Sequence, residues 1–288
     1  ADTHAPNLPN MDSWGDSLLL TSDGVGHAGV AVKVLAKSLV VDSELNVGSF
    51  DAEVKEGITL QGDLISGDAV YLYSERWDTN LGETTREIST QGITAGGDLR
   101  VESMDLLFAG SLDITGDATL RGYDLLFEQL VTVDGALDVA KATYQDESDA
   151  ALAPEALPEH LNTVFEGKTV VGGDFDITDA QWVDFNDEVS GGVGNGAGGD
   201  GGDFNITSYE IDTINHRLEG GDINWDVVNS NFFFNAPIHS RDLILETDIV
   251  DSRIEFNDTL YAEGDVVFDI DQLKAIDHRV DAHGIDWE

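Results

Sequence analysis

The sequence has 288 residues, with 57 Asp and Glu against 14 Lys and Arg, a net charge of −43 and no Cys. The lack of Cys excludes disulfides and thiolate metal sites. The scarcity of basic residues argues against a nucleic-acid partner, because binding to phosphates depends on Lys and Arg. No apolar run approaches the roughly 20 residues that a transmembrane helix needs, while 41% hydrophobic residues are enough for a folded core.

Residues 1–16 contain Pro6 and Pro9 and show no hydrophobic periodicity. They are expected to form an extended N-terminal arm, a candidate strand donor to another chain. The first residue is Ala1, and small residues are typical of the position where a signal peptide is removed. The sequence therefore predicts a mature exported chain, extracellular or at the cell surface, and trimming of the sequence in the laboratory is the alternative explanation.

From residue 17 to residue 288 the sequence predicts a single repeat domain, because one short pattern returns with a 19-residue period. Gly97-Asp98-Leu99 recurs as Gly116-Asp117-Ala118 and then as Gly135-Ala136-Leu137. The sequence Asp-Leu-Leu-Phe at 105–108 returns unchanged at 124–127. Further members of the pattern are aligned on Gly62, Gly173, Gly202, Gly221, Arg241 and Gly264.

Within each repeat, apolar residues alternate with polar ones. Leu99 and Val101 are followed by Leu106 and Phe108 and then by Leu112 and Ile114, and alternation over such short runs predicts strands, not helices. Three short strands and their corners within one repeat predict one coil. The expected fold class is therefore all-β: a parallel β-solenoid, or β-helix, whose inward side chains stack on those of the coils above and below.

The strand pattern Gly97-Asp98-Leu99-Arg100-Val101 and its 19-residue spacing resemble the parallel β-helix of secreted bacterial surface proteins. Filamentous-haemagglutinin-like adhesins and autotransporter passengers are the nearest types, and bactofilin-type cytoskeletal solenoids look similar as well. The resemblance covers roughly residues 39–144 and 169–287. It implies an exported surface or filament protein, and it transfers no active-site residue because no family motif maps onto the chain.

Two segments interrupt the repeat. Residues 145–168 are predicted to form a short helical insertion, because Leu161, Val164 and Phe165 follow Pro158 at helical spacing. The insertion is expected to replace part of a coil, since the pattern returns at Gly173 in the same 19-residue register. Residues 189–202 are predicted to form a Gly-rich loop. At 232–234, three consecutive Phe predict a strand whose central ring is either an exposed contact surface or covered by the insertion.

The acidity requires screening, because like charges destabilise a compact fold. Either molar salt or bound calcium would supply it. The candidate calcium ligands are carboxylates that share a strand face or a turn, and residues of the Gly-rich loop that resemble half of a calcium-binding nonapeptide: Asp174 and Asp176, Asp184 and Asp187, Asp269 and Asp271, Asp200 and Asp203. A solvated acidic face is the alternative for all of them.

The sequence favours a non-enzymatic extracellular structural protein. It would be the subunit of a cell-surface filament, sheath or adhesive layer that self-assembles into a homo-oligomer or polymer and is stabilised by cations. The first alternative is a monomeric, calcium-dependent module that binds cell-surface polysaccharide or mediates adhesion. The second is a β-helix polysaccharide lyase or hydrolase, which the scattered Arg residues and the acidic surface disfavour.

Overall fold

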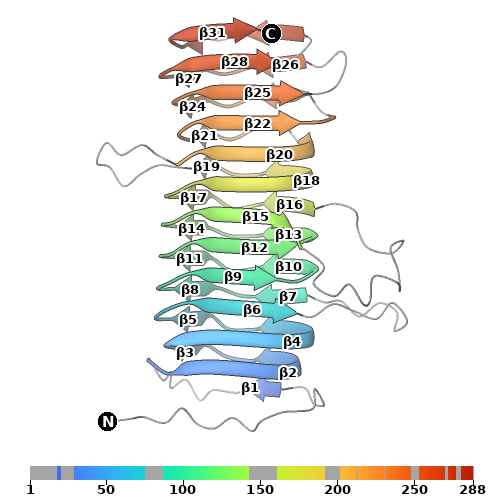
Figure 1. The fold of residues 1–288 in the computed structure, drawn as a ribbon, viewed down its shortest axis with the longest axis vertical. Coiled ribbons are helices and arrows are strands. Elements are labelled where there is room, and N and C mark those ends of the chain that lie inside the picture. Colours follow the sequence, from blue (N-terminus) through green and yellow to red (C-terminus); the bar gives the residue numbers. More distant parts are fainter. Residues whose placement is uncertain are drawn as a thin grey trace.

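The computed structural model describes residues 18–20, 29–74, 87–142, 161–191, 202–211, 213–229, 231–247, 253–269, 272–276 and 280–287. The predicted arm at 1–16 lies outside these residues. The described part contains 31 strands and no helix, and hence no helix that could cross a membrane. Figure 1 shows the strands stacked as the rungs of one elongated body, with β1 at one end and β31 at the other.

Three sheets run along the stack. The largest has 17 strands, namely β1 (Leu18–Leu20), β2 (Ala31–Val41), β4 (Ser49–Leu60), β6 (Val70–Ser74), β7 (Glu87–Thr90), β9 (Leu99–Glu102), β10 (Asp105–Phe108), β12 (Ala118–Gly122), β13 (Asp124–Phe127), β15 (Leu137–Lys141), β16 (Leu161–Phe165), β18 (Phe175–Phe185), β20 (Phe204–Ile211), β22 (Ile223–Val227), β25 (Leu243–Thr247), β28 (Asp265–Asp269) and β31 (Gly284–Trp287).

The second sheet has 11 strands, namely β3 (Leu45–Val47), β5 (Leu64–Ser66), β8 (Ile93–Ala95), β11 (Leu112–Ile114), β14 (Val131–Val133), β17 (Thr169–Val171), β19 (Val189–Ser190), β21 (Leu218–Glu219), β24 (Ile238–Ser240), β27 (Leu260–Ala262) and β30 (Val280–Asp281). The third has three strands, namely β23 (Phe232–Phe234), β26 (Arg253–Phe256) and β29 (Gln272–Ile276).

The parallel β-solenoid predicted from the repeats is confirmed. Each strand pairs in parallel with the equivalent strand one coil away, so that Asp105 lies beside Asp124 and Ala118 lies beside Leu137. The partners in both pairs are one repeat length apart in the chain, as stacked coils require. Side chains on these strands alternate between buried and outward positions, and every inward position therefore stacks on its equivalent.

The core is a set of stacked columns along the length of the solenoid. Phe108, Phe127 and Phe165 are each 0% exposed, and their rings stack nearly parallel, with centroids 5.0 and 4.5 Å apart. Such stacking adds an aromatic contribution to the burial of each ring. Because each coil packs only on its neighbours, stability is shared between adjacent coils.

The helical insertion predicted at 145–168 is wrong over the part that the structure describes. Residues 161–165 form strand β16, in which Leu161, Thr163 and Phe165 point inward and are fully buried. Residues 143–160 lie outside the described part. Leu137 on β15 pairs directly with Phe175 on β18, although the two residues are two repeat lengths apart in the chain. The chain between them therefore forms a single coil with additional residues. The insertion adds to a coil that keeps all three strands, and the return of the 19-residue register at Gly173 is a coincidence of its length.

Two further details differ from the sequence prediction: the sheet to which one repeat belongs, and the start of the Gly-rich loop. Leu64 belongs to the 11-stranded sheet, where it pairs with Ile93. The repeat aligned on Gly62 therefore lies in a different sheet from the repeat aligned on Gly97. The equivalent of Leu99 is Val70. Val189 and Ser190, at the start of the predicted Gly-rich loop, form β19, and residues 192–201 lie outside the described part.

Candidate functional site

The Asp that follows the repeat Gly holds one coil to the next. The backbone N–H of Asp117 donates a hydrogen bond of 3.0 Å to Oδ1 of Asp98, and the N–H of Ala136 donates one of 2.9 Å to Oδ1 of Asp117. The same contact returns later in the chain, where the N–H of Asp265 donates to Oδ1 of Asp242 at 2.7 Å. We call this column of side chains the corner Asp ladder. It satisfies backbone donors that the turns would otherwise leave to water.

The repeat Gly makes room for this ladder. A Cβ at Gly116 would lie 2.2 Å from Oδ1 of Asp98, and a Cβ at Gly264 would lie 2.0 Å from Oδ1 of Asp242. The Gly of one coil therefore accommodates the carboxylate of the coil before it. The Gly-Asp pair recognised in the sequence is thus one interlocking device between neighbouring coils.

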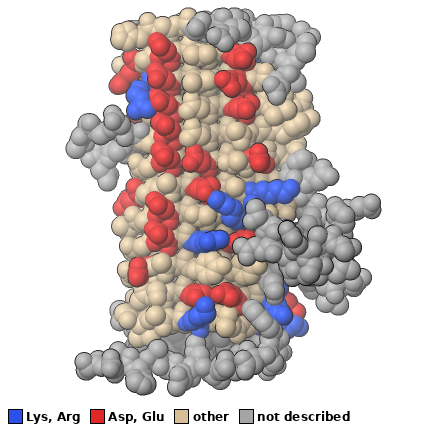
Figure 2. All heavy atoms as spheres, viewed as in Figure 1, with Lys and Arg blue, Asp and Glu red and all other residues tan. Residues whose placement is uncertain are grey.

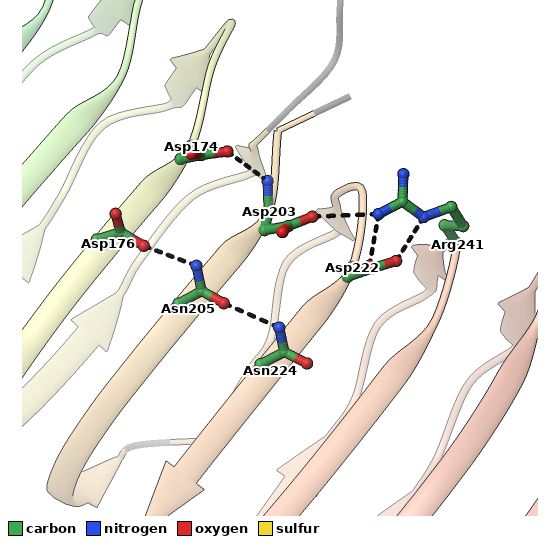
Figure 3. A network of polar contacts seen from close by, with 7 residues as sticks. All are labelled: Asp174, Asp176, Asp203, Asn205, Asp222, Asn224 and Arg241. Atoms are coloured by element: carbon green, nitrogen blue, oxygen red, sulfur yellow. Dashed lines mark hydrogen bonds and ion pairs between the residues drawn. The ribbon is translucent and has the colours of Figure 1, made fainter. Parts of the chain in front are cut away.

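An Arg clamps part of the same ladder (Figure 3). Arg241 donates from Nε to Oδ1 of Asp222 at 2.6 Å and from a terminal nitrogen to Oδ1 of Asp203 at 3.2 Å. Asp203 in turn donates its backbone N–H to Oδ1 of Asp174 at 2.9 Å. One guanidinium thereby pairs with carboxylates from two coils, a geometry that the planar, multidentate Arg side chain is suited to.

Replacing Arg241 with Ala should lower the free energy of unfolding by about 1 kcal/mol in low salt, because the carboxylates of Asp203 and Asp222 would then face each other without a cation. The loss should shrink near about 1 M salt, where the Debye length is about 3 Å. Urea unfolding at both salt concentrations measures the effect. Arg217→Ala, which removes a single exposed pair with Glu219, is the control, and a loss for Arg241→Ala that is independent of salt would contradict the clamp.

Amide side chains form two further ladders. The Nδ2 of Asn224 donates to Oδ1 of Asn205 at 2.8 Å, and the Nδ2 of Asn205 donates to Oδ1 of Asp176 at 2.7 Å (Figure 3). The second ladder is made of Asn257, Asn235 and Asn215, with donor–acceptor distances of 2.8 and 2.9 Å. An Asn both donates and accepts, so it extends a stack without the repulsion that aligned carboxylates would suffer.

Two pairs of the predicted calcium ligands accept hydrogen bonds, one pair from the next coil and the other from residues nearby in the chain. Asp174 and Asp176 flank the buried Phe175 and both point outward, as strand alternation predicts, and both accept hydrogen bonds from the next coil. Asp184 accepts from the side chain of Asn186 at 3.0 Å, and Asp187 accepts from the N–H of Glu188 at 2.7 Å.

Of the four remaining candidates, two belong to the residues that the structure describes and two do not. Asp203 is held by Arg241, and Asp269 is exposed on β28. Asp200 and Asp271 lie outside the described residues. Among the residues that the structure describes, no three His, Asp or Glu side chains are gathered so as to hold a metal ion. Calcium binding stays a prediction.

A row of carboxylates that the sequence analysis missed lies on the outer face of β22, β25 and β28. Asp226 is in register with Glu246, and Glu246 is in register with Asp269. All three are exposed, and Figure 2 shows acidic side chains gathered in vertical columns along one face of the molecule. The signal was present in the sequence, because each of the three follows its corner Asp (Asp222, Asp242, Asp265) by four positions.

An Arg side chain covers the central ring of the three consecutive Phe. Phe232 and Phe234 are buried in the core at 1% exposure. Phe233 points outward, and the guanidinium of Arg253 lies over its ring, 4.6 Å from the centroid. This cation–π contact covers the ring, so neither an open contact surface nor the insertion is needed to account for Phe233.

Strand β2 is basic, with two Lys and no acidic residue. Lys33 donates to Asp51 at 2.8 Å and to Glu53 at 3.2 Å, and Lys37 pairs with Glu56 at 2.8 Å. The hydrogen bond to Asp51 raises the pKa of the Lys33 amine above its ordinary value near 10.5, so this side chain is fully charged at neutral pH. Acidic partners of the next coil therefore stabilise a basic strand at this end.

Comparisons with protein-family models, with curated proteins and with solved structures give no match for this chain.

Proposed function

We propose that this chain is a non-enzymatic structural protein, the self-assembling subunit of an extracellular or cell-surface filament, sheath or adhesive layer stabilised by cations. The observation that carries the proposal is that polar side chains on the surface form hydrogen bonds from one coil to the next. The corner Asp ladder, the two Asn ladders and Arg241 bind coil to coil along the molecule. Side chains arranged in this way stiffen a rod, since each coil is tied to its neighbours by both core packing and hydrogen bonds.

The acidic columns support the role of cations. Asp226, Glu246 and Asp269 stand in register on successive coils, and aligned carboxylates repel one another unless a cation or salt screens them. Calcium, whose ligands are oxygens, is the divalent cation that this surface would take.

Light scattering on a sizing column, combined with negative-stain electron microscopy, tests the proposal. The chain is run with calcium, with a chelator, and in low and molar salt. Species much larger than the 31.0 kDa monomer, visible as rods or filaments and reduced by chelation or low salt, are expected. A compact monomer in every condition would overturn self-assembly, and release of reducing ends from a polysaccharide panel would overturn the non-enzymatic role.

A monomeric polysaccharide-binding module is the second candidate, and exposed rings favour it. Trp182 is 41% exposed and Tyr209 is 40% exposed. Val228 is also exposed and lies next to Tyr209 on the following coil. Large exposed apolar side chains are typical of contact surfaces. Retention of the monomer on an insoluble, uncharged polysaccharide, lost in Trp182→Ala and kept in Leu35→Ala, is the result that would favour this candidate.

A further inference from the structure

The chain contains two copies of the acceptor motif for N-linked glycans, which is Asn, any residue except Pro, and then Ser or Thr. The copies are Asn205-Ile206-Thr207 and Asn257-Asp258-Thr259. The motif is short, and the sequence does not distinguish the two copies. Their places in the fold do, because a glycan is attached at an accessible surface turn.

The first copy lies inside a strand of the largest sheet. Asn205 is on β20, which pairs with β18 along one edge and with β22 along the other. Its side chain is also engaged on both sides, because Nδ2 donates to Asp176 at 2.7 Å and Oδ1 accepts from Asn224 at 2.8 Å (Figure 3). A glycosylating enzyme must bind the whole motif in its own active site, and β20 could enter it only if the sheet were opened. This copy is therefore closed to modification in the folded chain.

The second copy forms a corner between two sheets. Strand β26 ends at Phe256 and β27 begins at Leu260, so the motif occupies all the residues between them. All three residues of the motif are partly exposed. The N–H of Asn257 and the C=O of Thr259 bond to the preceding coil, while the N–H of Thr259 donates to Oδ1 of Asp258 at 2.6 Å, within the corner itself. The motif therefore has the turn conformation and the surface position that an acceptor needs.

The amide of Asn257 can carry a sugar and keep its place in the Asn ladder. Its Nδ2 donates to Oδ1 of Asn235 at 2.8 Å and, at 3.4 Å, to Oε1 of Glu255. The second contact is longer than an ordinary N–H···O bond and is the weaker of the two. An N-glycosidic bond replaces one N–H of the amide and leaves the other, which suffices for the bond to Asn235. A glycan at this corner is therefore compatible with the contacts that hold the coil.

We propose that Asn257 is the acceptor of an N-linked glycan and that Asn205 is not. In the reaction, Nδ2 of Asn257 attacks the anomeric carbon of a sugar activated as a glycosyl diphosphate. The new C–N bond replaces the C–O bond to the diphosphate, which leaves, and the amide loses one proton to a base of the transferase. The inference rests on the proposed extracellular location, because this modification is typical of exported chains. The glycan is bulky and hydrophilic, so it keeps this corner of the subunit facing solvent in an assembly.

Glycopeptide mass spectrometry of the full, folded chain tests the assignment. The purified chain is incubated with an oligosaccharyltransferase and its lipid-linked glycosyl diphosphate, and a glycan on Asn257 with none on Asn205 is expected. Asn257→Gln and Thr259→Ala each destroy the motif and should lose the glycan completely, whereas Thr259→Ser keeps the motif and should keep the glycan. Asn205→Gln removes the other motif by the same change, so it is the matched control and should leave the modification unchanged. Circular dichroism checks the fold of each variant.

The outcomes separate this inference from the proposed function. An unmodified Asn257 in the folded wild type, or a glycan on Asn205, would overturn the assignment even if the chain forms filaments. A glycan that persists in Thr259→Ala would show that the motif does not direct the modification, and would overturn the assignment as well. A glycan on Asn257 in a chain that stays monomeric in every condition would support the assignment and overturn self-assembly.

Discussion

Replacement of Phe165 with Ala should lower the free energy of unfolding by about 3–5 kcal/mol, the range for removing a fully buried aromatic ring. Phe165 is 0% exposed, and its ring stacks on Phe127 at 4.5 Å and on Phe185 at 5.2 Å. The cavity would separate coils that otherwise share one aromatic stack. Because the solenoid is held together by contacts between neighbouring coils, we also expect calorimetry to resolve two transitions where the wild type has one.

The neighbouring residue supplies the control for this prediction. Val164 is on the same strand, points outward and lines a shallow apolar groove with Leu107 and Leu126. Val164→Ala removes fewer atoms from a partly exposed site and should cost less than about 1 kcal/mol. Urea unfolding of both variants at one salt concentration makes the comparison. Equal losses for the two variants would show that the aromatic stack does not carry the stability assigned to it.

Gly110→Ala has the second largest expected effect, a loss of about 1–3 kcal/mol or more. A Cβ at Gly110 would lie 1.9 Å from the carbonyl oxygen of Gln91 and 2.7 Å from the nitrogen of Gly92, both backbone atoms of the preceding coil. These atoms have little freedom to move, because Ala109 donates its N–H to Thr90 at 2.9 Å and Ile93 donates to Ser111 at 3.0 Å. The extra methyl group would therefore push two coils apart.

The matched control is another corner Gly with space beside it. A Cβ at Gly67 would meet its nearest atom, the carbonyl oxygen of Gly48, at 3.6 Å, an ordinary contact. Gly67→Ala should be neutral or stabilise the fold by about 0.4–1 kcal/mol, because Ala has fewer conformations to lose on folding. Thermal and urea unfolding of the pair measure the difference. A Gly110→Ala variant as stable as Gly67→Ala would contradict the close packing of the corners.

Much of the candidate site could have been derived from the repeat itself. Residues that share a place in a 19-residue repeat stack on each other, so the alignment of Asp98 with Asp117 already implied a ladder of corner carboxylates. The row of Asp226, Glu246 and Asp269 follows the same rule, although only pairs within one strand were named from the sequence, and Asp269 was paired with Asp271. The clamp by Arg241 was not derivable, because the reach of a long side chain to two carboxylates depends on its rotamer.

The sequence by itself determined the fold class, the coil length and the inward faces, because a period of two within a period of 19 admits few structures other than stacked parallel strands. Only the tertiary structure decided which segment forms each rung. Leu161, Val164 and Phe165 have helical spacing, and yet 161–165 is strand β16, since Leu161, Thr163 and Phe165 complete the buried columns of adjacent coils. Local spacing is a weak preference, and burial against neighbouring coils outweighs it.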